Sequence, residues 1–168
     1  MSGATALTVP ADLERWAERI LSRAQDQGLS LVTAESCTGG LLAALLTDVE
    51  GVSGVFERGF VTYSKPSKCE LLCVPEDLAD RCGLVSEEVA RAMAAGALKQ
   101  SHGDIALSIT GYAGGSKDEE PGLVHLACQR RGRPAAHQRH RFGDIGRAAI
   151  RTETLRAALD MLEEAVGG

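Results

Sequence analysis

Short apolar segments alternate with helix-like segments along most of the chain, and this alternation is the strongest constraint on the fold. The clearest apolar segment, residues 105–110 (Ile-Ala-Leu-Ser-Ile-Thr), has the length of a buried strand and is too short for a helix. Residues 31–34 and 60–63 are predicted as two further strands. Strands that alternate with helices form sheets covered by helices, so the sequence predicts an α/β fold.

Helical spacing of apolar residues and end signals predict the intervening elements. Leu155, Leu159, Leu162 and Val166 recur at helical spacing near the end of the chain. The predicted helices cover about residues 10–27, 41–47, 66–72, 76–82, 86–101 and 145–165, and a hairpin joins predicted strands at 123–129 and 137–142. Residues 1–8 are expected to form a loose leader. The sheet is therefore predicted to be mixed and covered by helices.

Length and composition are those of one globular domain. The chain has 168 residues, of which 44% are hydrophobic and 24% are charged, which excludes a disordered chain. No apolar run approaches the roughly 18 residues of a membrane span, and the first residues do not resemble a secretory signal. We therefore expect a single cytoplasmic domain over residues 1–168, with its core at about 13–164 and no membrane partner.

The charge is distributed unevenly along the chain. The net charge is -5, yet residues 130–156 hold eight arginines against the acidic Asp144 and Glu153. A domain that binds nucleic acid is usually basic as a whole, so this distribution favours a local anion site and no nucleic-acid partner. The alternative is that these arginines lie on a solvated strand and helix face.

The cysteines and histidines do not predict a metal site. An odd count of cysteines (Cys37, Cys69, Cys73, Cys82 and Cys128) without a signal peptide fits a reducing compartment. Cys69 and Cys73 stand four residues apart, and we interpret them as buried reduced thiols because no second pair has zinc-finger spacing. His137 and His140 lie on opposite faces if they belong to a strand, so they are predicted to be surface residues.

Residues 34–40 (Ala-Glu-Ser-Cys-Thr-Gly-Gly) are the first segment that could carry chemistry. A serine on a tight turn between a strand and a helix is exposed, and the free N–H groups at the helix start can hold an oxyanion or a phosphate. Gly39 and Gly40 let the backbone approach a ligand. The alternative is a plain turn in which Ser36 or Thr38 caps the helix. Cys37 is a rival nucleophile, but a buried thiol is favoured for it.

Residues 63–68 (Tyr-Ser-Lys-Pro-Ser-Lys) form the second such segment. Tyr63 ends a predicted strand and Lys68 lies in the next helical turn, so both can point into one cleft. A lysine whose pKa is lowered by burial can deprotonate a serine, and a tyrosine hydroxyl can relay or orient the proton. The alternative is an exposed helix with two solvated lysines.

The third segment, residues 108–114, runs from the clearest strand into a glycine-rich loop. Ligands of open α/β sheets bind at the carboxyl ends of the strands, which makes Thr110, Gly111 and Gly114 candidate binding residues.

The three segments together resemble the C-terminal domain of the competence-damage protein CinA, a family whose stand-alone members include bacterial nicotinamide-nucleotide amidases. The similarity rests on A-E-S-C-T-G-G, on E-R-G-F-V-T-Y-S with Lys68 five residues after Tyr63, and on S-I-T-G-x-A-G, and it covers about residues 13–164. It implies a single α/β domain built as a three-layer sandwich, with a mixed, mostly parallel sheet flanked by helices. The family is usually dimeric, so a homodimer is expected.

The resemblance also implies an activity. Family members hydrolyse the carboxamide of nicotinamide mononucleotide to nicotinate mononucleotide and ammonia, without a metal or cofactor. The implied nucleophile is Ser36, the implied base is Lys68, and Tyr63 falls on the tyrosine of the site. Thr38, Gly39 and Gly40 are expected to contact the substrate, with backbone N–H groups near them holding the oxyanion. Thr110 and Arg147 fall on implied substrate-binding positions, and the basic stretch makes Arg147 the first candidate for the phosphate of the nucleotide substrate.

The sequence departs from the family pattern in two places. Gly115 stands where the third loop usually carries a proline, and this loop is about two residues shorter than usual. Lys65 and Pro66 replace small polar residues, so Lys65 offers a second amine beside Lys68. These departures leave two alternatives open: a non-catalytic nucleotide-binding or dimerisation module, and an amidase for another amide.

Overall fold

A computed structural model describes residues 9–115 and 118–168, and the expected leader at residues 1–8 lies outside the described part. The described chain contains six helices and five strands. In chain order they are α1 (Ala11–Asp26), β1 (Leu31–Glu35), α2 (Leu41–Thr47), β2 (Phe56–Val61), α3 (Lys65–Leu72), α4 (Glu76–Cys82), α5 (Glu87–Lys99), β3 (Ile105–Gly111), β4 (Leu123–Arg130), β5 (Ala136–Arg141) and α6 (Arg147–Gly167). No described helix is both long and apolar enough to cross a membrane.

The five strands form one mixed sheet in the order β2-β1-β3-β4-β5. β1 is parallel to both of its neighbours, β2 and β3, whereas β3–β4 and β4–β5 are antiparallel. Parallel neighbours end at the same edge of a sheet, so the carboxyl ends of β1, β2 and β3 lie together. The chain segments that follow these three strands are therefore brought to one place.

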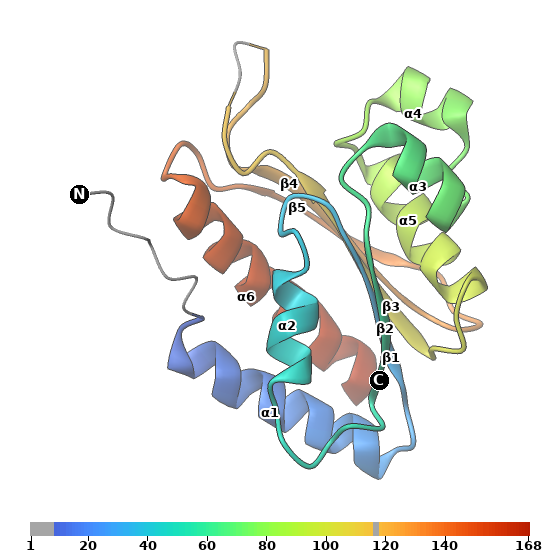
Figure 1. The fold of residues 1–168 in the computed structure, drawn as a ribbon, viewed down its shortest axis with the longest axis vertical. Helices are drawn as coiled ribbons and strands as arrows, with labels where there is room; N and C mark the ends of the chain where they lie inside the picture. Colours follow the sequence, from blue (N-terminus) through green and yellow to red (C-terminus); the bar gives the residue numbers. More distant parts are fainter. Residues whose placement is uncertain (1–8, 116–117) are drawn as a thin grey trace.

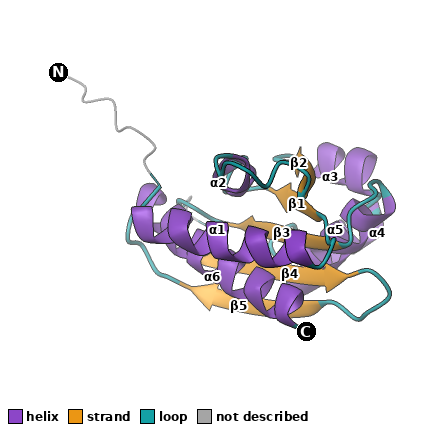
Figure 2. Cartoon of the chain, turned by 90° about the horizontal axis from the view of Figure 1, so that it is seen from below, coloured by secondary structure: helices purple, strands orange, loops and turns teal. Residues whose placement is uncertain are grey.

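Helices cover both faces of the sheet, which makes the single domain a three-layer sandwich. Helices α1, α2 and α6 lie on one side of the sheet, and α3, α4 and α5 lie on the other (Figures 1 and 2). Each side has its own apolar cluster, and the larger one lies under α1, α2 and α6. The predicted α/β sandwich with a mixed sheet is confirmed. The sheet is not mostly parallel as expected, because two of its four strand pairings are parallel and two are antiparallel.

The last helix shows why the apolar spacing was informative. Leu155, Leu159, Leu162 and Val166 are all buried, each with at most 1% of its surface exposed. They pack in the larger cluster together with residues of α1 and the sheet. A stripe at helical spacing thus marks the face that docks on the sheet.

Strand β2 begins earlier than predicted, at Phe56 instead of Phe60, and ends at Val61. It is an edge strand that pairs with β1 alone, so much of it remains exposed. Charged residues such as Glu57 and Arg58 are compatible with an edge strand. Because they interrupt the apolar pattern, the start of the strand was not predicted. Tyr63 therefore lies in the loop after the strand.

A glycine allows α3 and α5 to approach closely. A Cβ on Gly96 of α5 would lie 1.8 Å from the carbonyl oxygen of Leu72, the last residue of α3. A real Cβ cannot approach a backbone atom so closely, so only glycine permits this contact. The contact sets the position of α3, the helix that carries Lys68.

Candidate active site

Ser36 lies on the turn that joins β1 to α2, at the carboxyl edge of the parallel strands. Its N–H donates to the carbonyl of Ile109 on β3 at 3.0 Å, which holds the turn against the neighbouring strand. Gly39 and Gly40 follow with φ values of 61° and 95°, a left-handed backbone that favours glycine. These two glycines let the chain reverse within four residues and begin α2 directly.

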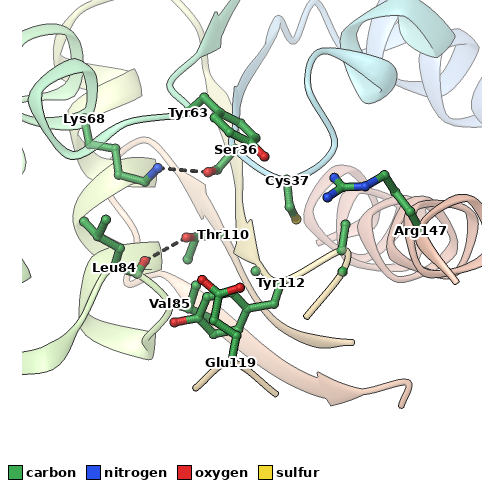
Figure 3. Close-up of a pocket in the computed structure, with 13 residues that line it drawn as sticks. Ser36, Cys37, Tyr63, Lys68, Leu84, Val85, Thr110, Tyr112, Glu119 and Arg147 are labelled. Carbon is green, nitrogen blue, oxygen red and sulfur yellow. Dashed lines mark hydrogen bonds between the residues drawn. The ribbon is translucent and has the colours of Figure 1, made fainter. Parts of the chain in front are cut away.

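The amine of Lys68 lies against the hydroxyl of Ser36. Lys68 Nζ donates to Ser36 Oγ at 2.9 Å and to the carbonyl oxygen of Thr62 at 2.6 Å. Figure 3 shows the two side chains pointing toward each other across the end of the sheet. The serine was expected to be exposed, but only 7% of it is, because the lysine and the walls of the site cover it. Two residues 32 positions apart in the sequence thus form one hydrogen-bonded pair.

Lys68 is buried and has no carboxylate partner among the described residues. Only 1% of the residue is exposed, and both acceptors of its amine are neutral oxygens. Burial disfavours the ammonium form, and it lowers the pKa of Lys68 from 10.5 to about 8. A lysine with this pKa can accept a proton near neutral pH.

The neighbouring Lys65 lies outside the site. Its Nζ pairs with the carboxylate of Asp80 at 2.6 Å on the surface, and this partner raises the pKa of Lys65. Ser64 caps α3 by accepting from the N–H of Ser67 at 3.2 Å, so the helix begins at Lys65. Lys68 then falls on the buried face of α3 and Lys65 on its outer side.

A cavity of about 220 Å³ opens beside the Ser36–Lys68 pair. The volume is below that of typical drug-sized sites, so the cavity fits a small group such as a single substituted ring. Its lining comes from the three strand ends, α3, the loop after β3, the segment before α5 and the start of α6. The lining residues are Ser36, Cys37, Tyr63, Lys68, Leu84, Val85, Thr110, Gly111, Tyr112, Ala113, Gly114, Glu119 and Arg147 (Figure 3).

The third sequence segment reaches the cavity. Thr110, Gly111 and Gly114 all line it, as does Arg147. The hydroxyl of Thr110 donates to the carbonyl of Leu84 at 2.7 Å, so it joins β3 to the segment before α5. Gly114 lies against the guanidinium of Arg147, because a Cβ there would be 3.3 Å from Nη2.

Three residues predicted to bind substrate do not line the cavity: Thr38, Gly39 and Gly40. The Thr38 hydroxyl instead donates to the carboxylate of Glu35 at 2.6 Å, on the side of the turn that faces α2. The N–H of Gly39 donates to the carbonyl of Ser36 at 3.0 Å. The hydroxyl of Thr38 and this one amide therefore serve the turn itself.

Tyr63 lines the cavity, but its hydroxyl has no hydrogen bond among the described residues. The residue is 66% exposed, and the amine of Lys68 binds the carbonyl of Thr62 in place of a tyrosine oxygen. Figure 3 shows its ring lying beside Ser36 at the mouth of the cavity. In this state, the structure provides an aromatic wall and no proton relay through Tyr63.

Cys37 is buried next to the pair, with 4% of the residue exposed. Burial raises the pKa of its thiol to about 11, so the thiolate is scarce at neutral pH. The thiol therefore lacks the activation that a cysteine nucleophile needs.

Two arginines of α6 flank the Ser36 turn, and the sequence indicated one of them. Arg147 has no ion pair within the described chain. Arg151, one turn further along, donates from Nε to the carbonyl of Cys37 at 2.9 Å. The four-residue spacing from Arg147 was the available signal for Arg151.

Tyr112 and Glu119 also line the cavity, and neither was predicted, because the glycine pattern of the loop after β3 does not indicate which of its side chains face inward.

Two predictions outside the site were wrong. His137 is no surface residue, because its side chain is 11% exposed and its Nε2 is 3.0 Å from Nδ1 of His125 under α5. Cys73 is exposed rather than buried, because it follows the last residue of α3 with a φ of 54° and leaves the helix face of Cys69. The described residues contain no group of ligands that could hold a metal ion.

Comparisons with known proteins show the family to which the chain belongs. The family model described as the CinA C-terminal domain matches residues 13–166. A CinA-like protein of Akkermansia muciniphila is 53% identical over 109 residues, which are 63% of this chain and 26% of that protein. Another, of Citrifermentans bemidjiense, is 44% identical over 154 residues, 90% of this chain and 37% of that protein. The chain thus spans about a quarter to two fifths of these relatives.

A solved structure covers nearly the whole chain. The crystal structure of the competence/damage inducible protein CihA from Agrobacterium tumefaciens is 44% identical, with a TM-score of 0.91 over 96% of this chain and 99% of that one. The family model and the solved structure thus match nearly the whole chain, one by sequence and the other by fold. The chain described above therefore belongs to the CinA C-terminal domain family.

Proposed function

We propose that the protein is an amidase that hydrolyses the carboxamide of nicotinamide mononucleotide to nicotinate mononucleotide and ammonia. The observation that carries the proposal is the buried contact of 2.9 Å between Lys68 Nζ and Ser36 Oγ at the edge of a cavity. A serine with a buried amine beside it, and no carboxylate to hold that amine in its charged form, is an activated nucleophile. The substrate comes from the family resemblance.

In the first step the neutral amine of Lys68 takes the proton of Ser36 as Oγ attacks the carboxamide carbon. The carbonyl oxygen becomes an oxyanion. The amides of Thr38 and Gly40, in the turn after Ser36, have no acceptor among the described residues, so they are the candidate donors to it although neither residue lines the cavity itself. The amide of Gly39 is excluded because it donates to Ser36 within the turn.

In the second step the oxyanion collapses and the carbon–nitrogen bond breaks. Lys68 returns its proton to the leaving nitrogen, which departs as ammonia, and Ser36 keeps the acyl group as an ester. Water then attacks the ester, its proton passes to Lys68, and the proton returns to Ser36 as the acid leaves. No step of this sequence requires a metal or a cofactor.

The cavity supports a substrate with one ring and a charged extension. About 220 Å³ fits the pyridine ring better than a whole nucleotide, so the ribose and phosphate would extend outward past Arg147. Tyr63 and Tyr112 offer aromatic surface to the ring. The expected homodimer is part of the same proposal, and the exposed side chains of Val61, Tyr63 and Leu71 in the β2–α3 segment support it.

The test is ammonia release by the purified protein from nicotinamide mononucleotide, nicotinamide riboside, free nicotinamide and a panel of unrelated amides. We expect turnover of the mononucleotide. If ammonia is released only from another amide, that amide is the substrate and the proposed Ser36–Lys68 mechanism still holds. Tight binding of the mononucleotide without ammonia from any amide would establish the non-catalytic alternative.

We expect kcat/KM to rise with pH and to level off near pH 8. The base must be neutral, and with a pKa of about 8 only about a tenth of Lys68 is neutral at pH 7. Below pH 8 the rate should therefore fall about tenfold per pH unit. A profile that keeps rising to pH 10 would contradict the lowered pKa, and Lys65→Met should leave the profile unchanged.

Replacing Arg147 by methionine is expected to raise KM for nicotinamide mononucleotide about 10- to 100-fold with little change in kcat, because a charged hydrogen bond to phosphate contributes about 1.5–3 kcal/mol. The rate with nicotinamide riboside, which lacks the phosphate, should not change. Arg156→Met is the matched control on the same helix, since Arg156 pairs with Asp12 away from the cavity. An equal loss with both substrates would contradict a phosphate contact.

A further inference from the structure

Glu35, the residue before Ser36, is a fully buried carboxylate to which the mechanism above assigns no part. It is 0% exposed, and its two oxygens accept three hydrogen bonds. Oε2 accepts from Thr38 Oγ1 at 2.6 Å and from the N–H of Leu42 at 3.0 Å, and Oε1 accepts from the N–H of Ala43 at 2.8 Å. The side chain therefore joins the Ser36 turn to the first turn of α2.

These bonds replace a missing helix cap. The N-cap residue of α2 is Gly40, which has no side chain to offer, and Leu42 and Ala43 occupy the second and third helical positions. Those are the N–H groups that a capping side chain normally satisfies. A carboxylate is well suited to the task, because the N-terminus of a helix carries partial positive charge. Glu35 thus caps α2 from within β1.

The backbone of Glu35 joins the same residue to the other half of the reacting pair. Its carbonyl oxygen accepts from the N–H of Thr62 at 2.8 Å, and the carbonyl of Thr62 in turn accepts from Lys68 Nζ at 2.6 Å. Displacement of Glu35 would move both the turn that carries Ser36 and the residue that anchors Lys68.

We propose that Glu35 is the positioning residue of the Ser36 turn, an inference that rests on the proposed Ser36–Lys68 chemistry. Its carboxylate holds residues 36–40 so that Ser36 Oγ meets Lys68 Nζ. Glu35 touches neither substrate nor reacting atoms and acts through the turn alone.

Two acceptor oxygens are essential to this arrangement. An amide of the same shape has one oxygen and one NH₂ group, whereas each oxygen of Glu35 accepts from a backbone N–H, which can only donate. In either orientation of Glu35→Gln the NH₂ group therefore faces the N–H of Leu42 or that of Ala43. Loss of either amide bond loosens the junction of turn and helix.

The test measures Ser36 reactivity in Glu35→Gln by two routes. The first is the rate of ammonia release, for which we expect kcat to fall roughly 100-fold with KM changed less than about threefold, as for a small misplacement of a reacting group. The second is the labelling rate with phenylmethylsulfonyl fluoride, in which Ser36 Oγ bonds to sulfur, fluoride leaves and Lys68 takes the proton. This rate should fall by a similar factor.

Asp104→Asn is the matched control. Asp104 accepts from the N–H and the hydroxyl of Ser30 at 2.8 and 2.9 Å, at the opposite end of β1, so it is an equivalent carboxylate with no link to Ser36. We expect its variant to label and turn over as the wild type does, whatever its melting temperature. An equal loss of labelling in both variants would show that Glu35 contributes only to the general stability of the fold, and it would overturn the proposal.

The two routes separate this inference from the proposed function. A wild-type protein that is labelled at Ser36 but releases no ammonia would refute the substrate, and labelling would still decide the role of Glu35. Wild-type labelling in a folded Glu35→Gln variant would overturn the role of Glu35 alone. If that variant does not fold, Thr38→Val, which removes the shortest of the three bonds, replaces it; about a tenfold loss is expected, and an unchanged rate would overturn the proposal.

Discussion

Replacing Ser36 by alanine is expected to lower ammonia release by about 10⁴-fold or more, because no other activated nucleophile lines the described cavity. Cys37 is the nearest alternative, but burial raises the pKa of its thiol to about 11. The substitution removes one acceptor of Lys68 and leaves the bond to Thr62 in place, so the fold should persist. Single-turnover assays with excess enzyme measure the residual rate.

The matched control is Ser30→Ala, at the opposite end of β1 from Ser36. Ser30 precedes β1 and binds Asp104, so its hydroxyl is far along the strand from the cavity. We expect Ser30→Ala to retain wild-type turnover. Full activity in Ser36→Ala would exclude the acyl-enzyme mechanism, whereas nucleotide affinity that is unchanged in Ser36→Ala would show that the binding site is intact.

Replacing Lys68 by methionine is expected to lower kcat about 10³- to 10⁴-fold, since the lysine serves as both base and acid in the proposed cycle. Methionine fills the buried channel of the lysine stem without a charge. It leaves the carbonyl of Thr62 without its partner, which costs about 1–3 kcal/mol, and it removes the cost of burying an amine. The melting temperature should therefore change little while the rate collapses.

Lys65→Met is the control for this variant, because the two lysines are three residues apart on one helix. Lys65 binds Asp80 on the surface, where an ion pair contributes about 0–1 kcal/mol. We expect Lys65→Met to retain wild-type turnover and nearly wild-type stability. Equal losses in the two variants would reject Lys68 as the base, and a loss in Lys65→Met alone would move that role to Lys65.

The tertiary structure changes the interpretation of several residues that the motifs brought together. Ser36 and Lys68 meet as the motifs suggested, because parallel strands carry residues 36 and 62 to the same edge. Thr38 was expected at the ligand, and its hydroxyl instead turns to Glu35 on the other side of β1. A motif shows which residues are near the turn, but the folded conformation of the turn decides which side each side chain reaches.

The predictions that failed concern features that depend on distant parts of the chain, which the local sequence does not show. Strand β2 is an edge strand exposed to solvent, so it contains charged residues. It therefore lacks the apolar pattern by which a central strand is recognised in the sequence. His137 was assigned to the surface because it and His140 lie on opposite faces of a strand, and the local sequence shows neither the helix above it nor its partner His125. Arg151 was missed because its bond goes to a backbone carbonyl 114 residues away.

The alternation of apolar and helical segments was enough to determine the α/β class and the buried face of α6, because burial follows local periodicity. Three short segments of the sequence also indicated Ser36 and Lys68. Only the tertiary structure decided that Lys68 is buried without a carboxylate partner among the described residues, and that Lys65 pairs with Asp80 on the surface. It also decided that Glu35 caps α2. These outcomes depend on contacts between distant segments, and it is those contacts that set the burial, the pKa and the reach of each group.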